Sequence, residues 1–576
     1  MAETLISPGV LARENDQSLV TAQPLARGAA IIGPTVKGPV EIPTYISSFG
    51  SFQAIFGGAL ESGSTDYTYL TSIAANNYFS QGGESLLVTR VTSGSFSEAT
   101  SSLIETGSGG PTSGLSPFIL ETLSEGVIMN TGVAEIANGA LQTGSADNVR
   151  WEIASVNTSS GVFSLLVRRG NDNNNQKVIL ESYNNISLDP FSPNYISRAI
   201  GDITSNVVVA PDGSGTYLQE SGSYPNISNY VRVKQVNFNT PHFFNNDGSA
   251  KDEFTGNLPA VGSGSFNGAI GSNINATEPN NFYENISTQT QGLVGTDYTT
   301  AISLLANQDD YQYNVISAPG LYYSGHGTQV NLLKNNTISR GDAIYVMDLV
   351  PYNTAIGTVT QNAAAIDSSY AAAYWPWLQT VDPSTGLLVY VPASTMIPGV
   401  YAFTDASSDP WFAPAGITRG GLGSVVRAER KLTSANRDTL YEANVNPIAT
   451  FPQQGVVVFG QKTLQKAATA LDRVNVRRLL ITLKGYISQI ADNLVFEQNT
   501  IATRQNFLTQ VNPYLESVQQ RQGLYAFKVV MDETNNTPDV IDRNELIGQI
   551  FLQPTKTAEF IILDFNVLPT GATFPA

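Results

Sequence analysis

The sequence predicts an α+β multidomain protein, in which a discontinuous α/β domain carries an all-β insertion and is followed by an α+β C-terminal module, with extended arms at both termini. The length of 576 residues allows roughly four domains of about 150 residues each. Charged residues make up only 14% of the chain, whereas glycine, serine, threonine and asparagine are abundant, which favours strands and loops over helical bundles. The expected parts are an N-terminal arm at 1–22, the α/β domain at 23–95 and 301–454, the insertion at 96–300, and the C-terminal module at 455–576.

The α/β domain is predicted from strand and helix patterns that follow one another along the chain. Residues 1–22 alternate without a helical period and contain Pro8-Gly9, so they precede the domain as an extended arm. An apolar strand at 29–39, a helix at 68–83 ending in Gly-Gly, and a buried strand at 85–91 then indicate an α/β layer. The pattern returns at 313–320 and 342–350, so we expect the domain to be interrupted by the segment between.

Residues 96–300 have a different character. Short alternating strands such as VFSLLVRR lie between turns rich in glycine, serine and asparagine, with little helical periodicity. The segment contains eight basic and nineteen acidic residues, a net charge of −11. We therefore expect an all-β insertion that faces solvent.

The C-terminal module is predicted to combine two helices with three strands. Apolar residues with the spacing of one face of an amphipathic helix predict the first helix: Val476, Leu479, Leu480, Leu483, Ile487, Ile490 and Leu494. Asp472 or Asn475 is expected to cap the start of this helix. A second helix is expected at 500–522, with a kink or restart at Pro513. Strand-like runs at 524–532, 545–554 and 558–568 close the chain.

Composition excludes several classes of function. The net charge of −18 argues against binding nucleic acid, because neutralising phosphates requires clustered lysine and arginine. There is no cysteine, hence no disulfide, thiol nucleophile or cysteine-ligated metal. The N-terminus lacks a signal-peptide pattern and no window approaches eighteen uninterrupted apolar residues, so we expect a protein that functions without membrane insertion.

The motifs predict neither catalysis nor a cofactor. The two histidines, His242 and His326, are far apart and are interpreted as surface-loop residues. The string at 455–463, GVVVFGQKT, lacks the adjacent Gly-Lys of a phosphate loop, and GGLG at 420–423 lacks the rest of a dinucleotide fingerprint. Carboxylate pairs such as Asp539/Asp542 are interpreted as turn caps or ion-pair partners.

The C-terminal module is electrically neutral, with eleven basic and eleven acidic residues, so the whole excess of negative charge lies upstream. A neutral block on an acidic chain suggests two surfaces with different neighbours. Five basic residues follow one another at intervals of 4, 7, 4 and 7 residues: Lys462, Lys466, Arg473, Arg477 and Lys484. An unbroken helix would place all five on one face, but a break expected near residue 475 leaves only Arg477 and Lys484 on the same face. A solvated polar face and a docking stripe remain open as interpretations.

At this point the residues resemble a known family, the tail sheath proteins of contractile-tailed, myovirus-type bacteriophages. The resemblance is carried most strongly by GVVVFGQKTL, ALDRVNVRRLLITLK, LVFEQNT, QRQGLYAFKVVMDETNNTPDVIDRNEL and FLQPTKTAEFIILDF, all within 455–565. SPGVLARENDQS, FSQGGESLLVTRV, VISAPG and WFAPAGITRGGL add support. The resemblance covers the N-terminal arm, the α/β domain and the C-terminal module, but does not reach residues 96–300.

The resemblance implies a non-enzymatic, mechanical protein of the virion, assembled in the host cytoplasm. Its subunits would stack as six-fold rings around a tail tube and contract to drive the tube through the host envelope. Partners would be further copies of the chain, the tube protein, and baseplate and tail terminator proteins, with no cofactor and no direct contact with nucleic acid. The insertion would project outward while the C-terminal module faces the tube.

The same resemblance implies how neighbouring subunits are joined. Arms at both termini would add strands to the C-terminal modules of neighbours, through Leu5, Ile6, Val10, Leu11, Phe560, Ile562, Asp564, Phe565 and Val567. The five basic residues of the C-terminal module are the hypothesised contacts to an acidic tube surface. Two alternatives stay open: the sheath of a bacteriocin-like or extracellular injection particle, and a β-rich glycan-binding tail adhesin with 96–300 as its binding module.

Overall fold

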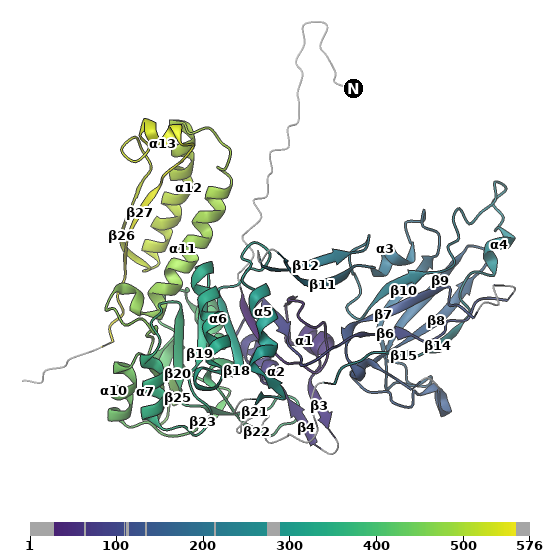
Figure 1. Cartoon of the computed structure of the whole chain (residues 1–576), viewed down its shortest axis with the longest axis horizontal. Coiled ribbons are helices and arrows are strands. Elements are labelled where there is room, and N and C mark those ends of the chain that lie inside the picture. Colours follow the sequence, from purple (N-terminus) through teal and green to yellow (C-terminus); the bar gives the residue numbers. More distant parts are fainter. Residues whose placement is uncertain are drawn as a thin grey trace, which may run out of the picture.

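A computed structural model describes residues 28–559, apart from 63–64, 109, 111–113, 133–134, 212–214 and 273–288. Three bodies are visible in Figure 1. A sheet flanked by helices lies in the middle, a β-rich body extends from one end of it, and a helical unit rises from the other end. The protein is thus a mixed α/β, multidomain chain with several separate sheets.

The middle body is built on an eight-stranded sheet that draws strands from both sides of the insertion. Across the sheet the strands lie in the order β2 (Thr44–Ile46), β5 (Leu86–Arg90), β1 (Ala29–Gly33), β18 (Val315–Tyr322), β19 (Ile344–Asp348), β20 (Ala371–Trp375), β24 (Val445–Phe451) and β25 (Gly455–Val458). The six inner strands are parallel, and the two edge strands run antiparallel to their neighbours. Parallel strands of this kind are buried on both faces, which explains the continuous apolar runs in the sequence.

Helices cover both faces of this sheet, and alternate residues of each strand point to opposite faces. On one face Ile31 and Val88 pack against α1 (Phe49–Phe56), α2 (Leu70–Ser80) and α8 (Ile397–Ser407). On the other face Ile32 and Leu87 pack against a second group of helices, namely α5 (Thr299–Leu304), α6 (Tyr323–Arg340), α7 (Ile356–Ala364) and α10 (Ser434–Glu442). Two apolar cores therefore enclose the sheet.

Smaller elements complete the middle body. A three-stranded sheet, two short hairpins and a one-turn helix lie at its periphery. They are β22 (Leu388–Val391), β21 (Leu378–Val381) and β23 (Val425–Ala428); β3 (Ala59–Ser62) with β4 (Thr65–Thr68); β16 (Gln289–Thr290) with β17 (Leu293–Val294); and α9 (Gly416–Arg419).

The insertion consists of two four-stranded antiparallel sheets that share one core. One sheet has the order β10 (Ile179–Ser187), β9 (Val162–Arg169), β8 (Val149–Asn157), β14 (Gly262–Gly264), and the other β13 (Val231–Val236), β7 (Phe118–Glu125), β6 (Glu98–Ser101), β15 (Phe266–Asn267). Phe118 of one sheet stacks on Phe163 of the other, with ring centroids 5.5 Å apart. Such face-to-face packing is that of a β-sandwich.

Further elements attach to the sandwich. The hairpin β11 (Thr204–Val209) and β12 (Thr216–Ser221) reaches back to the middle body, where Val207 and Leu218 pack against the core beside α5. Two short helices, α3 (Ile196–Ile200) and α4 (Asp252–Thr255), interrupt the β structure. The insertion is therefore β-rich rather than all-β.

A buried ionic network ties together strands of the first sandwich sheet. The guanidinium group of Arg168 donates two 2.8 Å bonds to Asp172 and a third, also 2.8 Å, to Glu152. Arg150 pairs with Glu135 and donates to the Gly139 carbonyl at 2.5 Å. The side chains of Arg150, Arg168 and Asp172 are fully buried. Two basic residues of the insertion, Arg150 and Arg168, are thus held inside by carboxylates.

The helical unit follows the sheet. Its elements are α11 (Val474–Asp492), α12 (Ile501–Gln520), β26 (Leu524–Val530), α13 (Pro538–Asp542) and β27 (Gln549–Pro554). The two long helices pack on the β26–β27 hairpin through Leu483, Phe507, Leu515 and Leu524, and the rings of Tyr486 and Tyr514 stack with centroids 3.8 Å apart.

The structure corrects several expected boundaries. Residues 289–304 belong to the middle body, because Leu293, Tyr298 and Ile302 lie in its core, so the insertion ends before residue 300. Strand β25 (Gly455–Val458) pairs with β24 and closes the large sheet. The C-terminal module therefore begins after Val458 and not at residue 455.

Two expected helix features are also corrected. Helix α11 begins after Arg473, and neither Asp472 nor Asn475 caps it through a side chain. Helix α12 runs through Pro513 without a restart.

A junction of ionisable groups joins the insertion to the middle body. Glu125 accepts a 3.1 Å bond from the Val40 backbone N–H, and buried Arg90 donates to the Glu125 carbonyl at 3.0 Å. Burial raises the pKa of the Glu125 carboxyl to about 7, and repulsion from Glu98 adds to this, against the opposing effects of the Val40 N–H, Arg90 and Arg232.

We expect the pH dependence of stability to reveal Glu125. Its folded pKa lies above the ordinary value of 4.5, so the unfolded state releases this proton first and stability falls as pH rises from about 4.5 to about 7. In the Glu125→Gln variant this part of the pH dependence disappears. Denaturant unfolding of both proteins across this range measures the difference; parallel stability curves contradict the assignment.

We also expect Asp172→Ala to destabilise the insertion by about 3–5 kcal/mol, because it leaves two buried arginines without their shared carboxylate. Thermal unfolding followed by calorimetry checks this. Glu545→Ala is the matched control, since it removes a carboxylate from the solvent-exposed pair with Arg543, and little change is expected there. Equal effects of the two substitutions would contradict the assigned role of the network.

Candidate functional site at the root of the C-terminal segment

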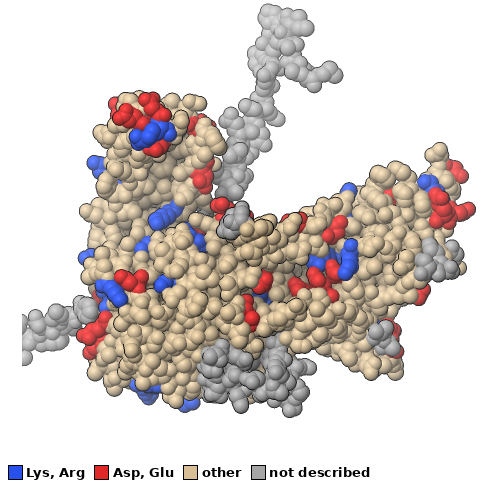
Figure 2. All heavy atoms as spheres, viewed as in Figure 1, with Lys and Arg blue, Asp and Glu red and all other residues tan. Residues whose placement is uncertain are grey.

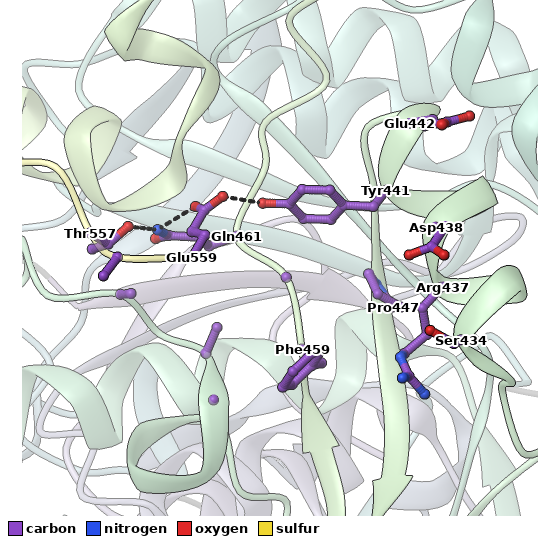
Figure 3. Close-up of a pocket in the computed structure, with 15 residues that line it drawn as sticks. Ser434, Arg437, Asp438, Tyr441, Glu442, Pro447, Phe459, Gln461, Thr557 and Glu559 are labelled. Carbon is purple, nitrogen blue, oxygen red and sulfur yellow. Dashed lines mark hydrogen bonds between the residues drawn. The ribbon is translucent and has the colours of Figure 1, made fainter. Parts of the chain in front are cut away.

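The candidate site lies where the chain descends from the helical unit and crosses the edge of the large sheet. After β27, residues 555–559 run past the loop that follows β25 and reach α10 (Figure 3). Residues Phe560, Ile562, Asp564, Phe565 and Val567 come directly after this crossing and lie outside the described residues, as do Leu5, Ile6, Val10 and Leu11 at the other terminus.

Glu559 is held by three side chains from separate parts of the chain. Arg473 donates two bonds to its carboxylate, from Nε at 2.7 Å and from Nη2 at 2.9 Å. The hydroxyl of Tyr441 donates at 2.5 Å, and Nε2 of Gln461 donates at 3.1 Å. Gln461 also donates to the hydroxyl of Thr557 at 2.6 Å. We call these five residues the arm clasp.

The electrostatics of the arm clasp favour an ionised glutamate. Burial opposes ionisation of Glu559, but the bonds from Arg473, Tyr441 and Gln461 outweigh it, so the pKa of the carboxyl lies below its ordinary value. Burial and the neighbouring Glu559 raise the pKa of Tyr441, which therefore keeps its proton and acts as a donor. A two-pronged arginine–carboxylate bond fixes orientation as well as position.

Lys462 supports the arm clasp from behind. Its Nζ lies 4.2 Å from the centroid of the Tyr441 ring and donates to the Tyr441 carbonyl at 2.7 Å. Burial and the nearby charge of Arg473 lower the pKa of Lys462. The lysine thus fixes α10 against the loop that carries Gln461.

A cavity of about 600 Å³ opens beside the arm clasp. In it Arg437 lies over the rings of Phe451 and Phe459, 5.5 Å and 5.8 Å from their centroids. The described residues that line the cavity include Ser434, Asp438 and Glu442 from α10 (Figure 3), and among them there is no histidine, lysine or cysteine. The arrangement can hold a polypeptide segment by charge-assisted hydrogen bonds; it does not assemble a nucleophile with a base.

The five basic residues predicted as a docking stripe are not brought together on one face. Lys462 and Arg473 belong to the arm clasp and its support. The Arg477 guanidinium lies 3.9 Å from the Tyr370 ring centroid, bonds to Ser369, and is buried. Lys466 and Lys484 are exposed, and Lys484 reaches the Tyr370 hydroxyl at 3.4 Å. Helix α11 begins only after Arg473, which agrees with the break expected near residue 475, and Arg477 and Lys484 both contact Tyr370. Arg477 is buried, however, and is not available to an outside partner.

Glu559 itself was not singled out by sequence reasoning. It is the second residue of the run AEFIILDF, and an acidic residue near the start of an apolar run is a weak signal. Its partner Arg473 is 86 residues away, so the pairing depends on the tertiary fold.

The two histidines lie in different surroundings. His326 is buried, not in a surface loop, with its ring against Tyr322, whereas His242 is exposed and stacks on Phe191. In the described part of the chain no group of three or more His, Cys, Asp or Glu side chains is placed to hold a metal ion. None of the described helices has the length and apolar character to cross a membrane.

The usual ligand position of a parallel α/β sheet is filled by the chain itself. That position lies beyond the carboxyl ends of β1 and β18, where the strand order reverses. There buried Gln291 accepts a 2.8 Å bond from the Leu70 N–H at the start of α2, and donates to the Pro319 carbonyl at 3.3 Å. A protein amide thus takes the place at which such folds bind a phosphate.

We expect Glu559→Gln to loosen the root of the C-terminal segment, because an amide cannot replace the two charge-assisted bonds from Arg473. Lys556 is exposed and provides a cleavage site for trypsin three residues before Glu559. Removal of residues 557–576, followed by mass spectrometry, should be at least about tenfold faster in the variant. Glu545→Gln is the control, and equal rates would contradict the clasp.

Two family models match this chain. Residues 291–464 match the phage tail sheath protein central domain, and residues 466–568 match the phage tail sheath C-terminal domain. The junction between the two matches falls between β25 and α11, where the large sheet ends and the helical unit begins.

Two phage tail sheath proteins are similar to part of this chain. The tail sheath protein of Vibrio phage KVP40 is 41% identical over 216 residues, which are 38% of this chain and 31% of that protein. That of Enterobacteria phage T4 is 37% identical over 229 residues, 40% of this chain and 35% of that protein. The matches thus span about a third of the length of each relative.

The fold is also similar to the crystal structure of the sheath tail protein from Listeria innocua. The TM-score is 0.50 at 10% identity, covering 92% of this chain and 95% of that one. The strands of the large sheet from β18 onward, the arm clasp and the helical unit lie in the segments that match the two family models. The chain contains the central and C-terminal domains of the phage tail sheath family.

Proposed function

We propose that this chain is the structural subunit of a contractile phage tail sheath, which polymerises as stacked hexameric rings around a tail tube. Contraction of the polymer then drives the tube through the host envelope. The observation that carries the proposal is the consecutive match of residues 291–464 and 466–568 to the two sheath domains. The named relatives are phage proteins, which favours a phage tail over an injection particle of another kind.

The β26–β27 hairpin is the proposed acceptor for strands from neighbouring copies. Within the described residues these two strands pair only with each other, so each has an outer edge of backbone donors and acceptors. Such an edge accepts an added strand readily. Each net backbone hydrogen bond contributes about 1 kcal/mol, a small amount that becomes large over a polymer.

The terminal segments are the proposed donors. Fully extended, the 22 residues of the N-terminal arm span up to about 70 Å, and the 17 residues after Glu559 up to about 55 Å. Both lengths suffice to reach an adjacent subunit. Strand pairing depends on the backbone more than on side chains, so a joint of this kind tolerates rotation of the attached domains.

In this proposal the arm clasp transmits tension into the subunit. A pull on residues 560–576 acts first on Glu559, and from there on Arg473 at the start of α11 and on Gln461 at the end of the large sheet. The tension is therefore shared between two rigid bodies and not borne by a single loop. The insertion, attached at the opposite end of the sheet (Figure 1), projects outward and meets neither the tube nor the arms. The baseplate and tail terminator remain the proposed partners at the ends of the polymer.

We expect the purified protein to form long tubular polymers visible by negative-stain electron microscopy. Deletion of residues 1–22 or of residues 560–576 should abolish these polymers and leave folded monomers, because each deletion removes one half of the joint. Phe191→Asp, which changes a side chain of the insertion that is 68% exposed, is the control and should leave polymerisation intact. Stable monomers or trimers of the full chain that bind glycans would contradict the sheath function and favour an adhesin.

A further inference from the structure

The cavity beside the arm clasp begins where the described part of the chain ends. Thr557, Ala558 and Glu559 are among the residues that line it, and Glu559 is the last described residue. The carboxylate of Glu559 is fixed by the arm clasp, so the chain continues from the wall of the cavity. The volume of about 600 Å³ is typical of pockets that enclose a ligand, which measure about 300–1,000 Å³.

One side of the cavity is apolar and carries a partly exposed aromatic ring. Phe459 is 45% exposed, and its ring centroid lies 5.0 Å from that of Phe451. Ala415 and Pro447 also line the cavity, and Figure 3 shows Pro447 and Phe459 among the residues around it. Apolar side chains from another segment would cover this surface favourably, because the area removed from water is itself apolar.

The other side of the cavity carries a half-buried cation. Arg437 of α10 lies over two phenylalanine rings and donates to the Leu432 carbonyl at 3.3 Å. None of the ion pairs among the described residues includes Arg437. The acidic residues that line the cavity from the same helix, Asp438 and Glu442, are exposed, so solvent screens their charges. A half-buried guanidinium in this position favours a carboxylate as its partner.

The residues that follow Glu559 have the matching order of properties. They read FIILDF: four apolar side chains, then the carboxylate of Asp564, then a phenylalanine. Tyr441 bonds to Glu559, and Arg437 precedes Tyr441 by one turn of α10, about 6 Å along the helix axis. Five extended residues span up to about 17 Å. The carboxylate of Asp564 can therefore reach Arg437, with the four apolar residues beside the apolar side of the cavity.

We propose that in the unassembled subunit the C-terminal segment folds back into its own cavity, with its first four apolar residues against Phe459 and Asp564 paired with Arg437. This inference rests on the proposed function and deepens it, because residues 560–576 are the proposed donors of a strand to a neighbouring copy. Residues that occupy their own cavity are not free to pair with the β26–β27 hairpin of a neighbour. The fold-back is therefore an autoinhibitory contact that opposes polymerisation.

The tether favours the chain's own C-terminal segment as the occupant. Because the segment starts at the cavity wall, its effective concentration there is on the order of millimolar, far above that of subunits in dilute solution. The N-terminal arm leads to β1, which four strands of the large sheet separate from β25, so that arm starts farther away. A neighbouring copy releases the segment only if its contacts with the segment are more favourable than those of the cavity.

The first test traps the contact in subunits that have not assembled. The chain contains no cysteine, so the pair Ser434→Cys and Asn566→Cys is the only source of a disulfide. Ser434 precedes Arg437 by nearly one turn, and Asn566 follows Asp564 by two residues. After oxidation, centrifugation separates unassembled subunits from polymers, and non-reducing electrophoresis distinguishes a bond within one chain from a bond between two.

The bond within one chain should form in most unassembled subunits and should be at least about tenfold rarer in polymers. The pair Phe191→Cys and Asn566→Cys is the control, because Phe191 is an exposed residue of the insertion. That pair should give no bond within one chain.

The second test measures the effect of the contact on assembly. Arg437→Ala removes the cation of the cavity and leaves the arm clasp unchanged, so it should shorten the lag before polymerisation, followed by light scattering, at least about threefold. Arg198→Ala is the matched control. It removes an exposed arginine of the insertion that also lies over an aromatic ring, that of Tyr224, and the lag should not change.

Three results overturn the inference. Absence of the bond within one chain from unassembled subunits means that the segment does not fold back. A bond between two chains in its place assigns the cavity to the segment of another copy. An equal lag for Arg437→Ala and the unmodified chain contradicts autoinhibition. Failure of the unmodified chain to polymerise counts against the proposed function alone, because the disulfide in unassembled subunits still reports whether the segment folds back.

Discussion

The pairing of β1 with β18 is the interaction on which the remaining structure depends. It aligns Ala29 with Val315 and Ile31 with Ser317, and so joins two segments separated by the whole insertion into one parallel sheet. Neither segment can bury both faces of its strands alone, because parallel strands need helices on each side. The entropy of closing so long a loop grows only slowly with its length, so an insertion of nearly two hundred residues is compatible with a continuous core.

This arrangement places the two ends of the molecule in different environments. The insertion is attached through Arg90 and Glu125 at one end of the sheet, and the helical unit is attached through α11 at the other. Strands β1, β2 and β5 precede the segments that match the sheath family, yet they complete the same sheet. The domain is therefore larger than the family match, and strand pairing places its N-terminal part in the same sheet.

The distribution of charge follows from which basic residues are used internally. Arg150 and Arg168 lie inside the insertion, and Arg473, Arg477 and Arg478 lie at the base of the helical unit. The C-terminal module, neutral as a whole, thus has two regions of different charge. At its base arginines hold the chain together, and at its far end, residues 493–500 and 531–548, exposed carboxylates lie around Phe496. The amino-acid composition gives only the total charge of the two regions, and the structure is needed to show that they lie apart.

The sequence by itself determined the presence of most elements, because hydrophobic periodicity is a local property of the chain. The apolar runs that became β1, β5, β18 and β19, the amphipathic stripe of α11 and the alternating strands of the insertion were all predicted near their observed places. The motifs of residues 455–565 were enough to indicate the sheath family. The positions of the joints between bodies were less well predicted, because an apolar strand such as β25 fits either neighbouring body until its pairing partner is known.

Only the tertiary structure decided which side chains meet. The arm clasp joins Glu559 to Arg473, Tyr441 and Gln461 across 86 to 118 residues, a distance at which spacing carries no information. The five basic residues illustrate the same limit: regular spacing fixes a common face only within one unbroken helix, and α11 begins only after Arg473. Arg477 and Lys484 therefore share a face, as the expected break near residue 475 implied, and the other three basic residues lie outside the helix. Phe496 is likewise an ordinary apolar residue in the sequence, and its exposure follows from the loop geometry that holds it away from the core.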